Sequence, residues 1–175
     1  MRVAKYLRIL IFISCLIILA QKGWAEKADA DMFASVVVNP IFSLSLDNAN
    51  INFGYVDPGT SVELKETTYY NMVVCNSNKG STWYMKVSIL GEVVGASEIA
   101  MDSFKFKIFS STGDGTYKND WQPFTKEAQV AYTSGTNDSA GGDVEIRFKY
   151  RLDLPGNAAG GNYSVKVLYT MTDVP

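Results

Sequence analysis

The sequence predicts an all-β protein, an antiparallel β-sandwich of about eight to ten strands. Two observations lead to this prediction. Apolar and polar residues alternate along most of the chain after residue 36, and turn-forming residues separate the alternating segments. A period of two places apolar side chains on one face of a strand and polar side chains on the other. This pattern is typical of antiparallel sheets with one face in water.

The alternation is clearest in six segments, residues 42–46, 70–74, 83–89, 104–108, 144–150 and 163–171. Five stretches rich in Gly, Pro, Asn, Asp or Ser separate strands and indicate turns, residues 57–59, 76–80, 113–115, 139–143 and 155–161. We expect one short helical turn within residues 92–101 and no longer helix.

Residues 1–25 have the features of a secretory signal peptide. Arg2, Lys5 and Arg8 precede an apolar run over residues 9–20, and small residues lead up to Ala25. A run of this length is too short to cross a bilayer, so we predict no transmembrane span. The protein is therefore expected in the periplasm, at the cell surface or outside the cell.

The chain after the leader divides into a polar tether, residues 26–35, and one sandwich domain, residues 36–175. Val36, Val37 and Val38 form a short β-prone run ahead of Pro40. Its first interpretation is an ordinary first or edge strand, whose pairing Pro40 limits. The alternative is a donor strand that inserts into the next subunit of an assembly.

Composition excludes several kinds of chemistry. The chain has no histidine, so it has no Ser-His-Asp site and no histidine-ligated zinc. Four basic residues leave with the leader, and the remaining 12 Lys and Arg against 18 Asp and Glu give a net charge of −6. This acidic balance argues against nucleic-acid binding. We expect no enzyme activity, because no two acids are paired as glycoside hydrolysis requires.

We expect no cofactor and no metal site. The acidic turns at residues 114–120 and 137–143 lack the alternate ligand spacing of a calcium loop. A small calcium- or carboxylate-dependent glycan-active protein is therefore the least favoured alternative.

Two cysteines are present, and Cys15 lies inside the apolar run of the leader. Cys75 is thus alone in the exported chain and has no internal partner. It is predicted to be a reduced thiol near a strand end; the alternative is a disulfide between two chains.

Two short motifs resemble the WxL domain of bacterial surface proteins. That family has a Trp-x-Leu motif after a strand and turn, and a second one in a C-terminal strand that finishes at proline. Here the corresponding residues are Trp83-Tyr84-Met85 and, ahead of Pro175, Tyr169-Thr170-Met171. The resemblance implies a module that associates non-covalently with the cell wall or a surface glycan, with Trp83, Tyr84, Met85, Tyr169 and Met171 as candidate binding residues.

Residues 51–59 and 154–163 are also similar to the spore coat protein U and fimbrial-subunit group. Those proteins are secreted immunoglobulin-like sandwiches, so this resemblance implies a coat or pilus subunit that assembles by strand exchange. Both resemblances imply a non-enzymatic protein of the bacterial envelope. Its partners would be a cell-wall polymer, other envelope proteins or further copies of itself.

Aromatic side chains are candidates for a glycan platform, because flat rings stack on the apolar faces of sugars. The alternation places Trp83 toward the core and Tyr84 on the opposite face. Tyr117 and Trp121 lie in an irregular stretch between strands.

Overall fold

The computed structural model describes residues 32–64, 71–95 and 99–175. The predicted leader, Cys15 and residues 26–31 of the tether lie outside the described residues. The chain separates into two units, Met1–Val38 and Asn39–Pro175. The first strand begins at Phe42, and residues 32–41 form no strand in the described part of the chain. The expected first or edge strand at Val36, Val37 and Val38 is therefore not present in this structure.

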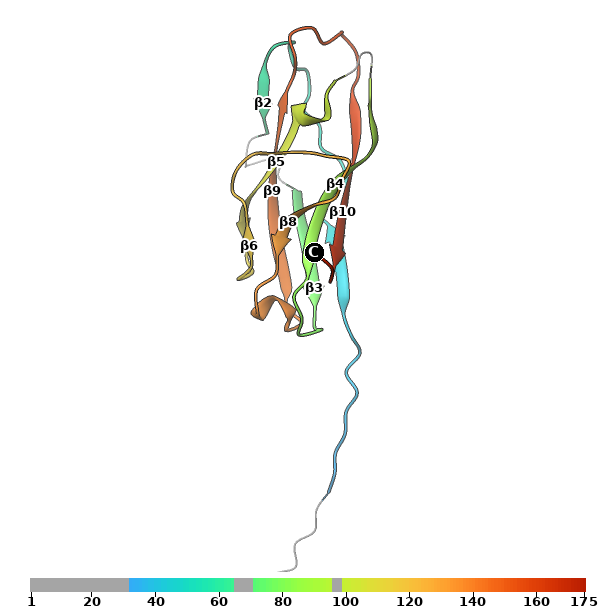
Figure 1. Cartoon of the computed structure of the whole chain (residues 1–175), viewed down its shortest axis with the longest axis vertical. Helices are drawn as coiled ribbons and strands as arrows, with labels where there is room; N and C mark the ends of the chain where they lie inside the picture. Colours follow the sequence, from blue (N-terminus) through green and yellow to red (C-terminus); the bar gives the residue numbers. More distant parts are fainter. Residues whose placement is uncertain (1–31, 65–70, 96–98) are drawn as a thin grey trace, which may run out of the picture. The chain divides into compact units, whose positions relative to one another are not determined.

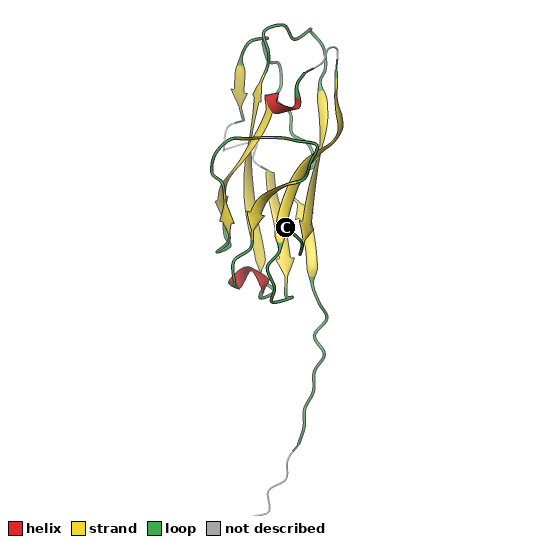
Figure 2. Cartoon of the chain, viewed as in Figure 1, coloured by secondary structure: helices red, strands yellow, loops and turns green. Residues whose placement is uncertain are grey.

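Within the described residues of the second unit there are ten strands and two short 3-10 turns, and the strands form two antiparallel sheets (Figure 2). The first sheet has the order β1 (Phe42–Leu46), β3 (Asn71–Ser77), β9 (Asp143–Asp153), β5 (Phe104–Ser111) and β7 (Gln122–Pro123), with β2 (Ser61–Glu63) also paired to β9. The second sheet has the order β10 (Ser164–Thr172), β4 (Tyr84–Val94), β8 (Gln129–Thr133) and β6 (Thr116–Tyr117). The prediction of an all-β sandwich is confirmed.

The core lies between the two sheets, where the apolar members of most alternations meet. The prediction for residues 70–74 was wrong: in β3 the buried apolar residues are Val73 and Cys75, whereas Met72 and Val74 lie on the other face of the strand. In β9, every second residue from Val144 to Leu152 is buried. The facing residues of β4 include Met85, Val87 and Ile89, all buried. Full burial of one such side chain is worth about 1.5–3 kcal/mol, so the regular alternation supplies the main driving force of this fold.

Another local prediction was wrong. Of the range 92–101 expected to hold the helical turn, residues 92–94 belong to β4 and residues 96–98 lie outside the described residues. The 3-10 turn observed, Met101–Ser103, begins only at the last residue of that range. Strand β4 continues because Val94 pairs with Ser164 of β10, beyond an irregularity in the ladder between Ser164 and Lys166. Gly91, with φ at +88°, supplies a backbone conformation in this part of β4 that other residues rarely adopt.

On one side of β9, the neighbouring strand is not the same along the whole length of the first sheet. Strand β3 pairs with the first half of β9, from Asp143 to Phe148, whereas β2 pairs with its last residues, up to Asp153. Strand β1 pairs only with β3, and β2 and β3 occupy opposite ends in Figure 1. Residues 47–60, which connect β1 to β2, contain no strand. One end of the sandwich is therefore bordered by a loop where the other end has β1.

Candidate functional site

The three consecutive valines that precede the sandwich are solvent-exposed. Val36, Val37 and Val38 are 84%, 91% and 71% exposed, and none belongs to a strand. β-Branched residues favour strands, because their side chains pack well on a pleated surface. The segment thus combines strand preference with no strand partner among the described residues.

The first family-like motif lies in the core. Trp83 and Met85 have no exposed surface. The Trp83 indole donates a hydrogen bond of 3.3 Å to the backbone oxygen of Asp138, and its ring centre lies 5.5 Å from that of Tyr132. Tyr84 is half-buried and pairs with Thr133 of β8. A ligand outside the sandwich has no access to Trp83 or Met85, so their contribution in this fold is packing.

The second motif packs beside the first. Strands β4 and β10 are antiparallel, and Met171 lies directly opposite Met85 in their ladder. Tyr169 pairs with Val87, two residues further along. The structure therefore brings the two sequence motifs together as one cross-strand layer, rather than as a surface patch.

Cys75 is fully buried in β3, and its thiol is reduced. Burial raises the pKa of this thiol to about 12, because the thiolate is poorly solvated there. The thiolate is the reactive form of cysteine. A disulfide between folded chains would require an accessible sulfur, so the packing favours the reduced thiol over the intermolecular bond.

The two acidic turns meet through hydrogen bonds. The Asp138 carboxylate accepts bonds from the Tyr132 hydroxyl at 2.6 Å, the Gly135 N–H at 2.8 Å and the Asp114 N–H at 3.0 Å. Burial acts to raise the pKa of Asp138, but these donors stabilise the charged form and hold the pKa below its usual value. Asn137 in turn donates to the Asp114 carboxylate at 2.8 Å. In the described ranges no group of three or more acidic or cysteine side chains is placed to hold a metal ion.

Two aromatic residues of the irregular stretch reach the surface. Tyr117 of β6 is exposed, and its ring stacks on that of Tyr132 with centres 6.1 Å apart. Trp121 is partly exposed, and the Lys107 ammonium lies 4.6 Å from the centre of its ring. These two side chains, rather than Trp83, are available to an external ligand.

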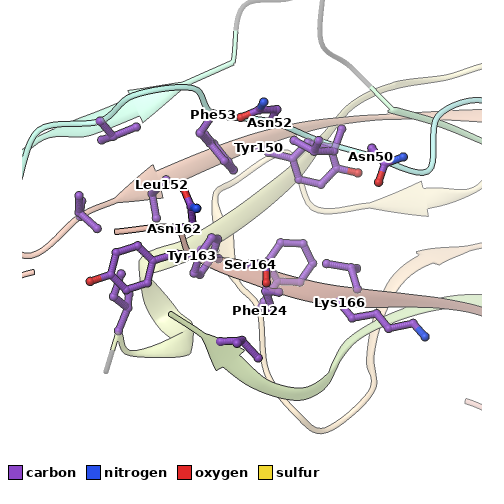
Figure 3. Close-up of a pocket in the computed structure, with 18 of the residues that line it drawn as sticks. Asn50, Asn52, Phe53, Phe124, Tyr150, Leu152, Asn162, Tyr163, Ser164 and Lys166 are labelled. Carbon is purple, nitrogen blue, oxygen red and sulfur yellow. The ribbon is translucent and has the colours of Figure 1, made fainter. Parts of the chain in front are cut away.

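A cavity of about 910 Å³ lies at the loop-bordered end of the sandwich. Its walls come from the loop at residues 47–60, from β9 and from β10. Figure 3 shows Asn50, Asn52 and Phe53 of the loop, Tyr150 and Leu152 of β9, and Ser164 and Lys166 of β10 around this space. Its volume falls at the upper end of the range of small-molecule sites.

The loop over the cavity has a defined conformation. The Asn52 side chain accepts a hydrogen bond of 2.8 Å from the Gly54 N–H, and Gly54 has φ at +72°. This asparagine turn leaves Phe53 partly buried against the core and Tyr55 fully exposed. The motif that resembles the coat and fimbrial group therefore forms one wall of the cavity.

Sequence reasoning did not identify the cavity or the Asp138 cluster. The walls of the cavity come from segments separated by about a hundred residues, so no local pattern joins them. The sequence suggested Asp138 only as part of an acidic turn that was weighed and rejected as a calcium loop. Its hydrogen-bond donors, on Asp114, Tyr132 and Gly135, come partly from a distant turn and were not apparent in the sequence. The signal that was available is the pair of Asp- and Gly-rich turns at residues 113–115 and 135–143.

No match to this chain was found among protein-family models, curated proteins or solved structures. The class that the architecture defines is an all-β protein with two antiparallel sheets. Among the described residues, no helix is long and apolar enough to cross a membrane.

Proposed function

We propose that this protein is an exported, non-enzymatic structural subunit of the bacterial envelope. In this proposal, one copy assembles with the next by adding the segment with Val36, Val37 and Val38 to a sheet edge. The observation that carries the proposal is the exposure of three consecutive β-branched residues with no strand partner in the described chain. The predicted signal peptide supplies the expected location.

In this proposal, the binding site for the added strand is the edge of a sheet. Strands β1 and β10 each lie at one edge of their sheet, and an edge strand has one row of backbone N–H and C=O groups without a ladder partner. An added strand would satisfy these groups and would bury its apolar side chains, as in other cases of β-strand addition. Leu168, on the outer face of β10, is 44% exposed and would gain apolar neighbours from such an assembly.

The test uses the chain that begins at Glu26. Light scattering measures the molar mass of the species that this chain forms in solution, across a range of concentrations. We expect assemblies larger than a monomer for the wild-type chain. The triple variant Val36→Ser, Val37→Ser, Val38→Ser should shift toward monomer, because serine lowers both strand preference and apolar burial.

The matched control changes three exposed valines elsewhere in the chain, Val94→Ser, Val130→Ser and Val174→Ser. It should assemble as the wild-type chain does. A wild-type chain that stays monomeric up to roughly 100 μM, well beyond the micromolar range of ordinary weak association, would contradict the proposal. Equal assembly by the triple variant at residues 36–38 would contradict it as well.

Association with a cell-wall glycan is the second candidate, and the exposed ring of Tyr117 and the partly exposed ring of Trp121 favour it. We expect the chain to be retained by purified peptidoglycan, and the double variant Tyr117→Ala, Trp121→Ala to be retained less. Tyr55→Ala removes an exposed ring from another loop and serves as the control. No retention of the wild-type chain would contradict this candidate.

A further inference from the structure

We propose that the cavity at the loop-bordered end of the sandwich binds a neutral, mainly apolar molecule that carries a hydrogen-bond acceptor oxygen. Long-chain ketones and esters are the chemical class that fits. The proposal goes beyond the assembly proposed above and does not depend on it.

The walls of the cavity supply apolar contact from both sheets and from the loop. Inward-facing residues of β9 and β10 meet residues of the loop and of β5 across the space, among them Ile51, Phe53, Phe104, Leu152, Val165 and Val167. In Figure 3, Phe53 of the loop and Leu152 of β9 extend into the same region from two distant segments of the chain. Apolar side chains outnumber polar ones in this lining, as is usual for small-molecule sites.

A pair of tyrosines contributes a buried hydrogen-bonding group to the lining, in addition to its asparagine side chains. The hydroxyls of Tyr150 and Tyr169 lie 2.5 Å apart, and both residues line the cavity. One hydroxyl donates to the other, so one O–H of the pair remains without an acceptor among the described residues. Burial raises the pKa of both tyrosines, which keeps both hydroxyls protonated as donors. A ligand oxygen would accept this remaining O–H.

Charged side chains in the lining are paired or lie on outward-facing strand positions. Lys105 and Arg151 both form ion pairs with Asp153, at 2.7 and 2.6 Å. Glu92 is paired with Lys126. Lys166 is exposed and lies between Val165 and Val167, whose side chains take the opposite face of β10. A neutral ligand is therefore favoured over an ionic one, because an ion would have no opposite charge inside the cavity.

The experiment uses the chain that begins at Glu26 and the neutral fluorescent probe N-phenyl-1-naphthylamine. Undecan-2-one and undecane are the competitors, since they have the same chain length and differ by one carbonyl oxygen. We expect both to displace the probe, and the ketone to do so at a roughly three- to tenfold lower concentration, the advantage that one hydrogen bond provides.

Two variants of β10, one on each face of the strand, test whether the probe binds in the cavity. Val165→Trp fills the cavity and should weaken probe binding at least tenfold. Leu168→Trp adds the same ring on the outer face of the strand, outside the lining, and should leave binding unchanged. Equal affinity of the two variants, with both folded by circular dichroism, would overturn the site.

The double variant Tyr150→Phe, Tyr169→Phe keeps both rings and removes both hydroxyls. The ketone should then lose its advantage over the alkane, while the probe still binds. A ketone preference that persists in this variant would overturn the role of the tyrosine pair.

Amide chemical shifts of the wild-type chain provide a readout that needs no variant. Undecan-2-one should shift signals of residues 51–56, 150–154 and 163–167, and shifts confined to other parts of the chain would overturn the proposal. The triple serine variant at residues 36–38 should bind the probe as the wild-type chain does. Loss of probe binding in this variant would show that the probe binds to the valine segment instead of the cavity. The assembly proposal would still be tested separately, by the light-scattering measurement of molar mass.

Discussion

The Tyr132 hydroxyl donates a hydrogen bond of 2.6 Å to the carboxylate of Asp138, six residues further along the chain. Both residues are buried, and Asp138 also accepts N–H groups from Gly135 and Asp114. One carboxylate thus joins the end of β8, the 3-10 turn at Asn137–Ser139 and the turn that follows β5. The backbone oxygen of Asp138 also accepts the Trp83 indole N–H, so the same residue connects this turn to the core tryptophan.

Asp138→Asn should lower the free energy of unfolding by about 1–3 kcal/mol. The asparagine amide keeps one acceptor oxygen and places an N–H₂ group among donors, so at least one bond is lost. Urea denaturation measures the effect. Asp120→Asn, on an exposed aspartate with no hydrogen bond to its carboxylate among those resolved in the described chain, is the control. Equal stability of the two variants would contradict the role of Asp138.

Stability should fall in acid. The pKa values of Asp138 and Asp153 are below their usual range in the folded chain: burial opposes ionisation, but hydrogen bonds to both carboxylates and the cations beside Asp153 outweigh it. Between the unfolded and the folded pKa, the unfolded chain binds more protons, so stability is present above about pH 4 and is lost as the pH falls through the folded values.

Urea denaturation at a series of pH values from about 6 down to 2, the window in which carboxylates titrate, measures this dependence. Asp138→Asn should have a shallower slope than the wild-type chain, because one of the two contributing groups is gone. A slope as steep as that of the wild-type chain would assign the acid sensitivity to other carboxylates.

Trp83→Ala should cost about 3–5 kcal/mol of stability, because it leaves a cavity in the core and removes the bond to Asp138. Tyr55→Ala, at a fully exposed ring, should leave thermal unfolding unchanged. A mild effect of Trp83→Ala on unfolding, together with loss of glycan retention, would instead place Trp83 in a binding surface.

Cys75 should not react with a thiol reagent in the native chain that begins at Glu26, and should react once the chain is unfolded in urea. Burial blocks access of the reagent to the sulfur, and the raised pKa keeps the thiol from ionising to the reactive thiolate. The chain should therefore run as a monomer in non-reducing denaturing electrophoresis. A disulfide-linked dimer there would contradict the packing of Cys75.

Most strands were predictable because their pattern is local. The alternations that begin at Phe42, Phe104 and Val144 each set one face against the core, and β1, β5 and β9 follow them closely. The end of β4 was not predictable, because Glu92 and Val94 are both largely exposed and the pairing with Ser164 supplies what the local pattern lacks. The same reason applies to Val36, Val37 and Val38, whose strand preference has no partner in the described chain.

By itself, the sequence determined the all-β class and the inward face of most main strands, because a period of two is a property of neighbouring residues. The exception is β3, whose inward face carries Val73 and Cys75 rather than Met72 and Val74. The sequence also predicted that Trp83 faces the core. The tertiary structure decided that Met85 lies opposite Met171, that Asp138 collects three donors, and that the loop at residues 47–60 borders a cavity with β9 and β10. These relationships depend on strand order and register, which arise when the two sheets pack and which no single segment specifies.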